Sequence, residues 1–459
     1  MSNPADAVAA PRQELKRKLG VWSATAVVIG STIGSGIFRS PAGIADKLPG
    51  PLPMMAVWVA GGIFALCGAL TIAEVASALP QTGGIYVFCR DAWGRLPAFL
   101  FGWGQISMIR AASLGGIAIT FAEYFFRVMG FDPLPATLGI SRVHWAAAGA
   151  IALTGAFNYL GVRLAANVNN FTVVAKYGGL LFIIVVAFAF GLPHNGVSHY
   201  TPAVPPGSIT LPAFGLALVS TLWAFDGWAD LAYNAGEVLN PGRNLPRALI
   251  GGTLAVLGIY LAANLAYMAV LPIGEIRTSQ LVAADVAQQV LGGAGVAFVA
   301  ITVMISTFGT LNTVLFTSPR VFFAMADDGL FFRPVAKIHP KFGTPHVAIT
   351  LVAALGMVFV LLLPFEQLAD TFVTAFLPFY LLAVASVFKL RRSPGYSPTF
   401  RVPLYPLVPL LFIASVLYLL GNSIVQESSR MPTLAVLGVL LIGIPVYYMT
   451  VGRRPTGMA

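Results

Sequence analysis

About twelve long apolar segments restrict the fold of this chain more than any other feature of its sequence. They lie at residues 21–47, 52–79, 97–128, 143–161, 167–191, 212–238, 246–272, 285–318, 346–364, 367–390, 404–426 and 432–451. A helix needs roughly 20 apolar residues to cross a membrane, and inside the membrane the backbone must satisfy its own hydrogen bonds. The segments therefore predict an all-α polytopic membrane protein with twelve transmembrane helices and no soluble domain.

The composition agrees with this fold class. Charged residues make up 10% of the 459 residues, whereas a soluble protein carries about 25%. The net charge is +10, but with the N-terminus inside, 19 of the 27 Lys and Arg fall on the cytoplasmic side and six on the other. This positive-inside pattern explains the basic charge without nucleic acid as a partner. It predicts a plasma (inner) membrane protein with residues 1–20 and 452–459 as cytoplasmic tails.

Two of the apolar segments are interrupted. The first contains "VVIGSTIGSGIF", residues 27–38, with three glycines and three hydroxyl residues, and the sixth carries Asp226, Gly227 and Asp230. The two interrupted segments, the first and the sixth, are five positions apart, which is the spacing expected of an inverted repeat of five plus five helices. The first repeat would cover residues 21–191 and the second 212–390, with two extra helices at 404–451.

The interruptions have a physical interpretation. Irregular backbone inside a membrane is tolerated only beside a cavity. Amides of Ser35, Gly36 and Ile37 at the start of a half-helix would face a carboxylate, and freed carbonyls in the sixth segment would receive an ammonium, so an amino acid fits both. A side chain introduced by Gly36→Val is expected to occupy the place of the carboxylate. The alternative is that these glycines only allow close helix packing.

Four stretches carry a resemblance to a known family: "IGSTIGSGIFRSP", "LTIAEVASALPQTGGIYVF", "LWAFDGWADLAYNAGEVLNPGRNLPRALIGG" and "ISTFGTLNTVLFTSPRVFFAMADDGLFFRPVAKIHPKFGTPHVAI". They resemble the amino acid-polyamine-organocation superfamily, and most of all its L-type amino acid transporter branch. The resemblance implies a LeuT-like 5+5 inverted repeat with discontinuous helices 1 and 6, and alternating-access transport of amino acids. Bacterial members work without a heavy chain, so none is expected here, and the oligomeric state stays open, with a monomer allowed.

The resemblance also implies roles for individual residues. Those matching the loop that holds the substrate's carboxylate and amine are Thr32, Ile33, Ser35, Gly36 and Ile37. Trp223 matches an aromatic gate above the substrate, and Phe225 and Gly227 match positions beside its side chain. No cofactor is expected, and the five scattered histidines lack metal-ligand spacing.

Three charged residues inside the apolar segments are candidates for function, because intramembrane charge is costly. Lys176 matches a family lysine near the site where sodium-coupled relatives bind an ion, so its ammonium is interpreted as a substitute for sodium; the alternative is that it snorkels to the interface. Asp226 matches the position of an aspartate in family members that accept both cationic and neutral amino acids. Arg110 matches a position that is basic in some relatives. Alternatively Arg110 and Asp226 pair, and neither selects the side chain.

Other carboxylates are expected to be structural. Glu74 and Glu237 lie near the ends of their segments, where carboxylates are often paired. We expect them to bridge to loop arginines such as Arg243 and Arg247.

The sequence leaves the transport mode open between an exchanger and a proton-linked symporter of amino acids or polyamines, for which Lys176 is the candidate titrating group. A polytopic enzyme acting on lipid is a further alternative from another class. It lacks support because the loops hold no cluster of acid, base or metal-binding residues.

Overall fold

The computed structural model describes residues 17, 19–130 and 140–451, and its regular structure is helical. The long helices are α3 (Pro51–Ala78), α6 (Arg110–Met129), α7 (Arg142–Leu160), α8 (Val162–Asn195), α10 (Pro241–Val270), α12 (Val282–Asp327), α13 (His346–Leu362), α14 (Phe365–Leu390), α15 (Leu407–Val425) and α16 (Glu427–Thr450). The shorter ones are α1 (Val21–Thr32), α2 (Gly36–Lys47), α4 (Ile85–Trp93), α5 (Arg95–Gly104), α9 (Leu211–Phe225) and α11 (Ile273–Thr278). A π-helical turn, Gln105–Ile109, joins α5 to α6, and a 3-10 segment, η4 (Asp230–Glu237), follows α9. The expected tails lie almost wholly outside the described residues.

A helix covers each of the twelve apolar segments, but they differ in their capacity to cross a membrane. Within the described residues, eight helical stretches are long and apolar enough, one of them the continuous run Arg95–Met129 from α5 through α6, and α1 with α2 makes a ninth if the bent pair is one span. Helices α9 and α13 have 15 and 17 residues, fewer than a full crossing needs. Helix α7 falls short because polar residues such as His144 and Asn158 lower its hydropathy. Twelve crossings therefore remain a prediction.

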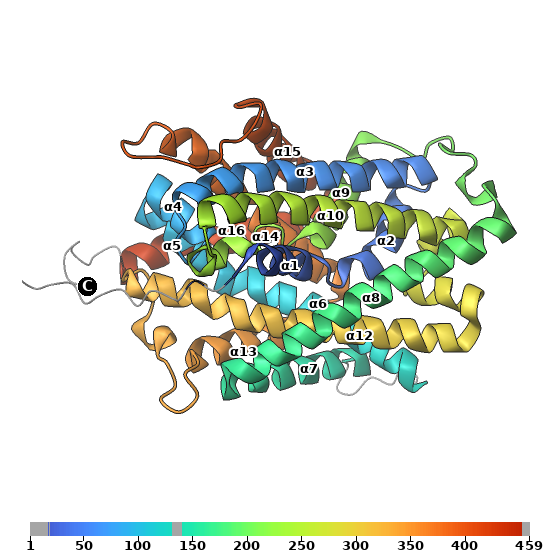
Figure 1. Cartoon of the computed structure of the whole chain (residues 1–459), viewed down its shortest axis with the longest axis horizontal. Coiled ribbons are helices and arrows are strands. Elements are labelled where there is room, and N and C mark those ends of the chain that lie inside the picture. Colours follow the sequence, from blue (N-terminus) through green and yellow to red (C-terminus); the bar gives the residue numbers. More distant parts are fainter. Residues whose placement is uncertain (1–16, 18, 131–139, 452–459) are drawn as a thin grey trace, which may run out of the picture.

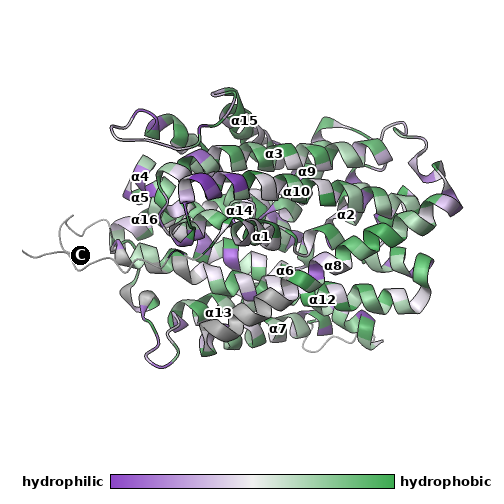
Figure 2. Cartoon of the chain, in the orientation of Figure 1, coloured by the Kyte–Doolittle hydropathy of each residue, from purple (hydrophilic) through white to green (hydrophobic). Residues whose placement is uncertain are grey.

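The long helices lie side by side along the longest axis of the molecule (Figure 1). Helix α3 packs on α10 and α8 packs on α12, while α1 lies at the centre between α10 and α12. Apolar residues cover most of the long helices, and hydrophilic residues gather toward the helix ends and loops (Figure 2). This distribution suits a lipid-facing surface. The surrounding helices enclose the break between α1 and α2.

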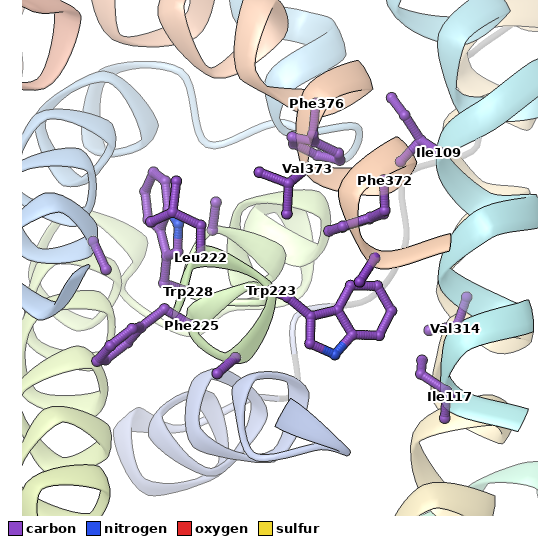
Figure 3. Close-up of a cluster of buried hydrophobic side chains, with 14 of the residues drawn as sticks. Ile109, Ile117, Leu222, Trp223, Phe225, Trp228, Val314, Phe372, Val373 and Phe376 are labelled. Carbon is purple, nitrogen blue, oxygen red and sulfur yellow. The ribbon is translucent and has the colours of Figure 1, made fainter. Parts of the chain in front are cut away.

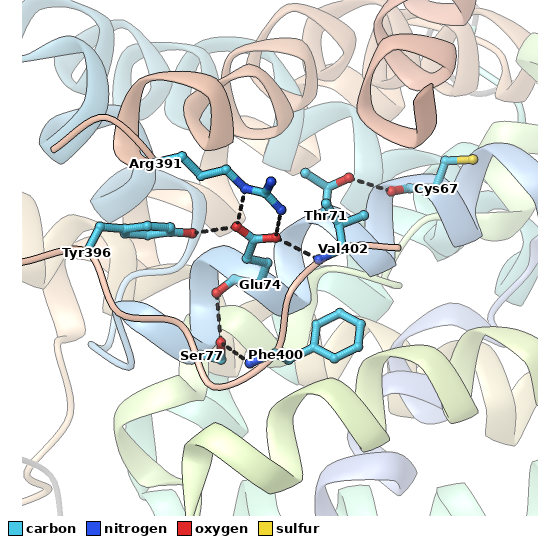
Figure 4. Close-up of polar contacts among 8 residues, drawn as sticks. All are labelled: Cys67, Thr71, Glu74, Ser77, Arg391, Tyr396, Phe400 and Val402. Carbon is cyan, nitrogen blue, oxygen red and sulfur yellow. Dashed lines mark hydrogen bonds and ion pairs between the residues drawn. The ribbon is translucent and has the colours of Figure 1, made fainter. Parts of the chain in front are cut away.

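The segment that follows α14 is anchored to α3 through Glu74 (Figure 4). The Glu74 carboxylate is fully buried and accepts hydrogen bonds from Arg391 Nε at 2.8 Å, from Arg391 Nη2 at 2.7 Å and from the Val402 amide at 2.6 Å. The structural role expected for Glu74 is confirmed, but the expected partners, Arg243 and Arg247, are wrong. The chain after α14 folds back over α3, and this tertiary contact brings Arg391 to the carboxylate.

Candidate functional site

The first break leaves backbone amides at the start of α2. The axes of α1 and α2 differ by 43°. Helical hydrogen bonding resumes where the amides of Phe38 and Arg39 donate to the Ser35 carbonyl, both at 3.1 Å. The amides of Ser35, Gly36 and Ile37 therefore precede the first hydrogen-bonded turn, at the positive end of the α2 dipole. Amides in this position can bind a carboxylate.

The side chains at the first break are already engaged. The Thr32 hydroxyl donates to the Val28 carbonyl at 2.8 Å. Ile33 and Ile37 are fully buried, and Ser35 is only 2% exposed. The break therefore offers its backbone, rather than its side chains, to a ligand.

The second break lies directly against the first. Helix α9 ends at Phe225, and Gly227 follows with a φ of 103°. A Cβ atom at Gly227 would lie 2.6 Å from the carbonyl carbon of Ser31, and one at Gly36 would lie 2.3 Å from the Cα of Ala224. Only glycine allows backbones to approach this closely. The predicted interruptions thus form one site in which each break presents a glycine to the other.

Tyr260 of α10 links the two breaks. Its hydroxyl lies 2.9 Å from the Thr32 carbonyl oxygen and 2.8 Å from the Ala224 carbonyl oxygen, within donating distance of both. These carbonyls belong to the last turns of α1 and α9, which lack helical partners. Sequence reasoning missed Tyr260. The sequence shows a tyrosine in the middle of the apolar run "LGIYLAAN", but it does not reveal which groups the hydroxyl contacts.

Lys176 of α8 reaches the end of α1. Its ammonium donates to the carbonyl of Gly30 and, at 2.8 Å, to the carbonyl of Ile33, and the residue is only 2% exposed. The snorkelling interpretation is wrong, because the side chain turns toward the break rather than the interface. A buried ammonium needs such acceptors.

Trp223 and Phe225 point to opposite sides of α9 (Figure 3). The Trp223 ring packs edge-on against Phe365 and Phe372 of α14, with centroid separations of 5.7 and 5.4 Å. Its indole nitrogen is buried and has no hydrogen-bond partner among the described residues. Phe225 packs on Tyr260 instead, at 5.1 Å. The structure therefore does not bring the predicted gate and the predicted side-chain contact to the same face.

Asp226 and Arg110 are neighbours with different direct partners. Asp226 Oδ1 accepts a hydrogen bond from Tyr380 Oη at 2.7 Å, and Arg110 Nε donates to Gln105 Oε1 at 2.7 Å. The ion pairs of the described residues do not include one between Arg110 and Asp226. Arg110 interacts at longer range with both Asp226 and Asp230, so this structure does not contain the proposed direct pair.

The geometry changes the reason for expecting a Gly36 variant to fail. A Cβ atom at Gly36 meets the backbone of Ala224 rather than the place of a carboxylate. We expect Gly36→Ala to destabilise the protein and abolish transport, because α2 and α9 must separate. A Cβ atom at Gly34 would lie 3.6 Å from Thr310, an ordinary contact, so Gly34→Ala is the matched control and should keep the melting temperature. Equal melting temperatures for both variants would contradict this packing argument.

Two broken helices that meet inside a multi-pass helical protein define the class of membrane transporters. The chain belongs to the amino acid permease family, whose model matches residues 19–445. It is therefore an amino acid transporter of this family, not an enzyme. The part of the chain that the structure describes holds no group of three or more His, Cys, Asp or Glu able to bind a metal ion.

Relatives with established names cover nearly the whole chain. The serine/threonine exchanger SteT of Bacillus subtilis is 34% identical over 95% of this chain and 97% of its own length. The b(0,+)-type amino acid transporter 1 of Mus musculus is 30% identical over 95% of this chain and 88% of its own. The large neutral amino acids transporter small subunit 2 of Mus musculus is 30% identical over 95% of this chain and 81% of its own length.

Proposed function

We propose that this protein exchanges L-amino acids across the plasma membrane by alternating access, without sodium. Neutral amino acids are its main substrates and cationic amino acids a second class. The observation that carries the proposal is the meeting of the two breaks: amides that precede the first hydrogen-bonded turn of α2 suit a carboxylate, and they lie against the end of α9, where the chain leaves its helix at Gly227. The name of SteT supports exchange as the transport mode.

The proposal includes a LeuT-like architecture of twelve membrane crossings. Residues 21–191 form the first five-helix repeat, 212–390 the inverted second repeat, and 404–451 two further helices. The positions of the breaks in the first and sixth crossings support this division, because paired discontinuous helices mark the binding site of inverted-repeat transporters. Both termini lie in the cytoplasm, and no heavy chain is required.

Sodium independence is inferred from Lys176. Its ammonium occupies the carbonyls of Gly30 and Ile33 at the first break, where a sodium ion would need oxygen ligands. A fixed cation supplied by the chain removes the need for a dissolved one.

The same contacts bear on the alternative of proton-coupled symport through Lys176. The two carbonyls that accept from Lys176 favour its charged form, whereas its burial favours the neutral form. Proton-coupled symport through Lys176 is therefore the alternative that the vesicle experiment below tests.

Selectivity for the side chain is assigned to Trp223, Asp226 and Arg110. Asp226→Asn is expected to weaken arginine uptake at least tenfold while leucine uptake changes less than threefold, because only a cationic side chain gains from the carboxylate. One lost charge contact of about 1.5–3 kcal/mol corresponds to a factor of this size. The measurement is competition of unlabelled arginine and leucine against labelled leucine. Equal effects on both amino acids would contradict the role of Asp226 in selectivity.

The proposed function is tested with purified protein in liposomes. Uptake of labelled alanine, leucine, arginine and glutamate is measured with and without unlabelled amino acid inside, and with potassium in place of sodium. We expect internal amino acid to stimulate uptake of leucine severalfold, with no difference between sodium and potassium. Uptake that ignores internal amino acid but follows an inward proton gradient would instead support the symporter.

A further inference from the structure

A buried polar cluster lies beside the breaks. It combines two carboxylates, Asp226 and Asp230, with one guanidinium, Arg110, and these three groups interact electrostatically. Asp226 and Asp230 are only partly exposed, and Asp226 also lines a small cavity with Tyr380 between α9 and α14. The cluster therefore borders a space that admits about one water molecule.

The groups that face the two carboxylates come from several elements. Helix α6 supplies Arg110, α14 supplies Tyr380, η4 supplies Tyr233, and α1 supplies the hydroxyl of Ser31, which bonds to Asp230. In the described part of α3, α10 and α12, no charged side chain acts on Asp226 or Asp230. Among the residues that the structure describes, Arg110 is the cation that faces the two carboxylates.

The charges of the cluster do not balance. Two carboxylates and one guanidinium leave one excess negative charge at membrane depth, where an uncompensated charge is expensive. Carboxylates that share a buried site do not both ionise readily, because like charges repel. Lys176 cannot supply the missing positive charge, since its ammonium is held at Gly30 and Ile33. One further unit of positive charge is needed.

Polar atoms without hydrogen-bond partners also lie in this cluster. The hydroxyl of Tyr233 is buried without a hydrogen-bond partner among the described residues, although it interacts with both carboxylates and with Arg110. The amide nitrogen of Gln105, whose oxygen accepts from Arg110, is likewise buried and unpaired. A protonated carboxyl would supply the donor that the Tyr233 oxygen can accept.

We propose that Asp226 and Asp230 form a proton-binding site, which holds one proton while the transporter carries a neutral amino acid and releases it when a cationic side chain binds. The inference rests on the proposed function and names its coupling ion. The proton leaves a carboxyl oxygen for the solution on the side from which the cationic substrate enters. It is taken up again on the side where that substrate leaves. The charge of the loaded site is then the same for both substrate classes.

The inference predicts proton movement during exchange of arginine for leucine. Liposomes that hold unlabelled leucine and a pH-sensitive dye receive labelled arginine outside. We expect the lumen to become more alkaline, with one proton leaving for each arginine that enters, and no pH change when leucine replaces arginine outside. Arginine uptake without a change in lumenal pH would overturn the inference, and so would leucine exchange that excludes arginine.

Labelled leucine exchange in the same vesicles separates this inference from the proposed function. If leucine exchange is absent, the result counts against exchange itself. If leucine exchange is present but arginine enters without a change in lumenal pH, the result counts against the proton site alone. In Asp230→Asn the single negative charge of Asp226 is balanced by the positive charge of Arg110, so no proton is needed. The number of protons released per arginine should therefore fall from one to none in the exchange activity that remains. A ratio that stays at one would overturn the assignment to Asp230.

Infrared spectroscopy tests the site without transport. Purified wild-type protein at neutral pH should show the carbonyl band of a protonated carboxylic acid, and this band should decrease when arginine replaces leucine. Asp230→Asn should remove the part of the band that responds to arginine, whereas Asp46→Asn, at an exposed ion pair with Arg277, should keep it. A wild-type spectrum in which arginine does not decrease the band, or an arginine response that survives Asp230→Asn, would overturn the proposal.

Discussion

Replacement of Lys176 by methionine is expected to abolish amino acid exchange and to lower the melting temperature. Methionine has a similar volume but no donor, so the Gly30 and Ile33 carbonyls lose the ammonium that satisfies them. A buried acceptor left without a partner costs about 1–3 kcal/mol. Two acceptors therefore place the loss at roughly 2–6 kcal/mol, a large share of the stability of a typical protein.

The expected loss of exchange has a more specific cause than instability. The carbonyls that Lys176 holds lie in the last turn of α1 and in the break, next to the amides proposed to bind the carboxylate. Without the ammonium, these peptide groups are free to reorient, so affinity for leucine should fall even in protein that remains folded. The measurement is leucine binding and melting temperature of the purified variant.

A matched control changes a lysine that makes no such contacts. Lys337 lies exposed in the loop between α12 and α13, so Lys337→Met should leave leucine binding and melting temperature at the wild-type values. Wild-type leucine binding by Lys176→Met would contradict the role assigned to Lys176 at the break.

The two breaks could be predicted from the sequence because each violates a local rule. Glycines and hydroxyl residues in the first apolar segment, and Asp226 with Gly227 in the sixth, do not suit an uninterrupted membrane helix. Lys176 was found for the same reason, since a lone charge in an apolar run has a high cost. Local conflicts of this kind are visible without knowledge of the tertiary structure.

The partners of these residues could not be predicted, because packing decides them. The sequence does not tell that a Cβ atom at Gly36 would face Ala224, that the Tyr260 hydroxyl lies between two helix ends, or that Arg391 reaches Glu74. Each contact joins elements far apart in the chain. Twelve crossings stay a prediction for a similar reason, because the role of short helices such as α9 and α13 in the membrane depends on their neighbours.

The anchor at Glu74 leads to an asymmetric prediction, in which loss of the arginine harms the protein more than loss of the carboxylate. The Glu74 side chain is 0% exposed, whereas that of Arg391 is 22% exposed and lies over the ring of Tyr405 at 3.7 Å. Arg391→Met leaves the buried carboxylate, among the described residues, with the Val402 amide and a weak contact from the Tyr396 hydroxyl. Removal of one partner of a buried pair costs about 3–5 kcal/mol.

Glu74→Gln should cost less, about 1.5–3 kcal/mol, because the neutral amide still accepts a hydrogen bond and water can reach the remaining guanidinium. The decisive variant is the double mutant. Because an uncharged glutamine tolerates burial without an arginine, Glu74→Gln should raise the melting temperature of Arg391→Met, although it lowers that of the wild type. Arg392→Met, at the exposed neighbouring position, should leave both backgrounds unchanged. Simple addition of the two losses would instead mean that the bond between Glu74 and Arg391 does not hold the segment after α14 on α3.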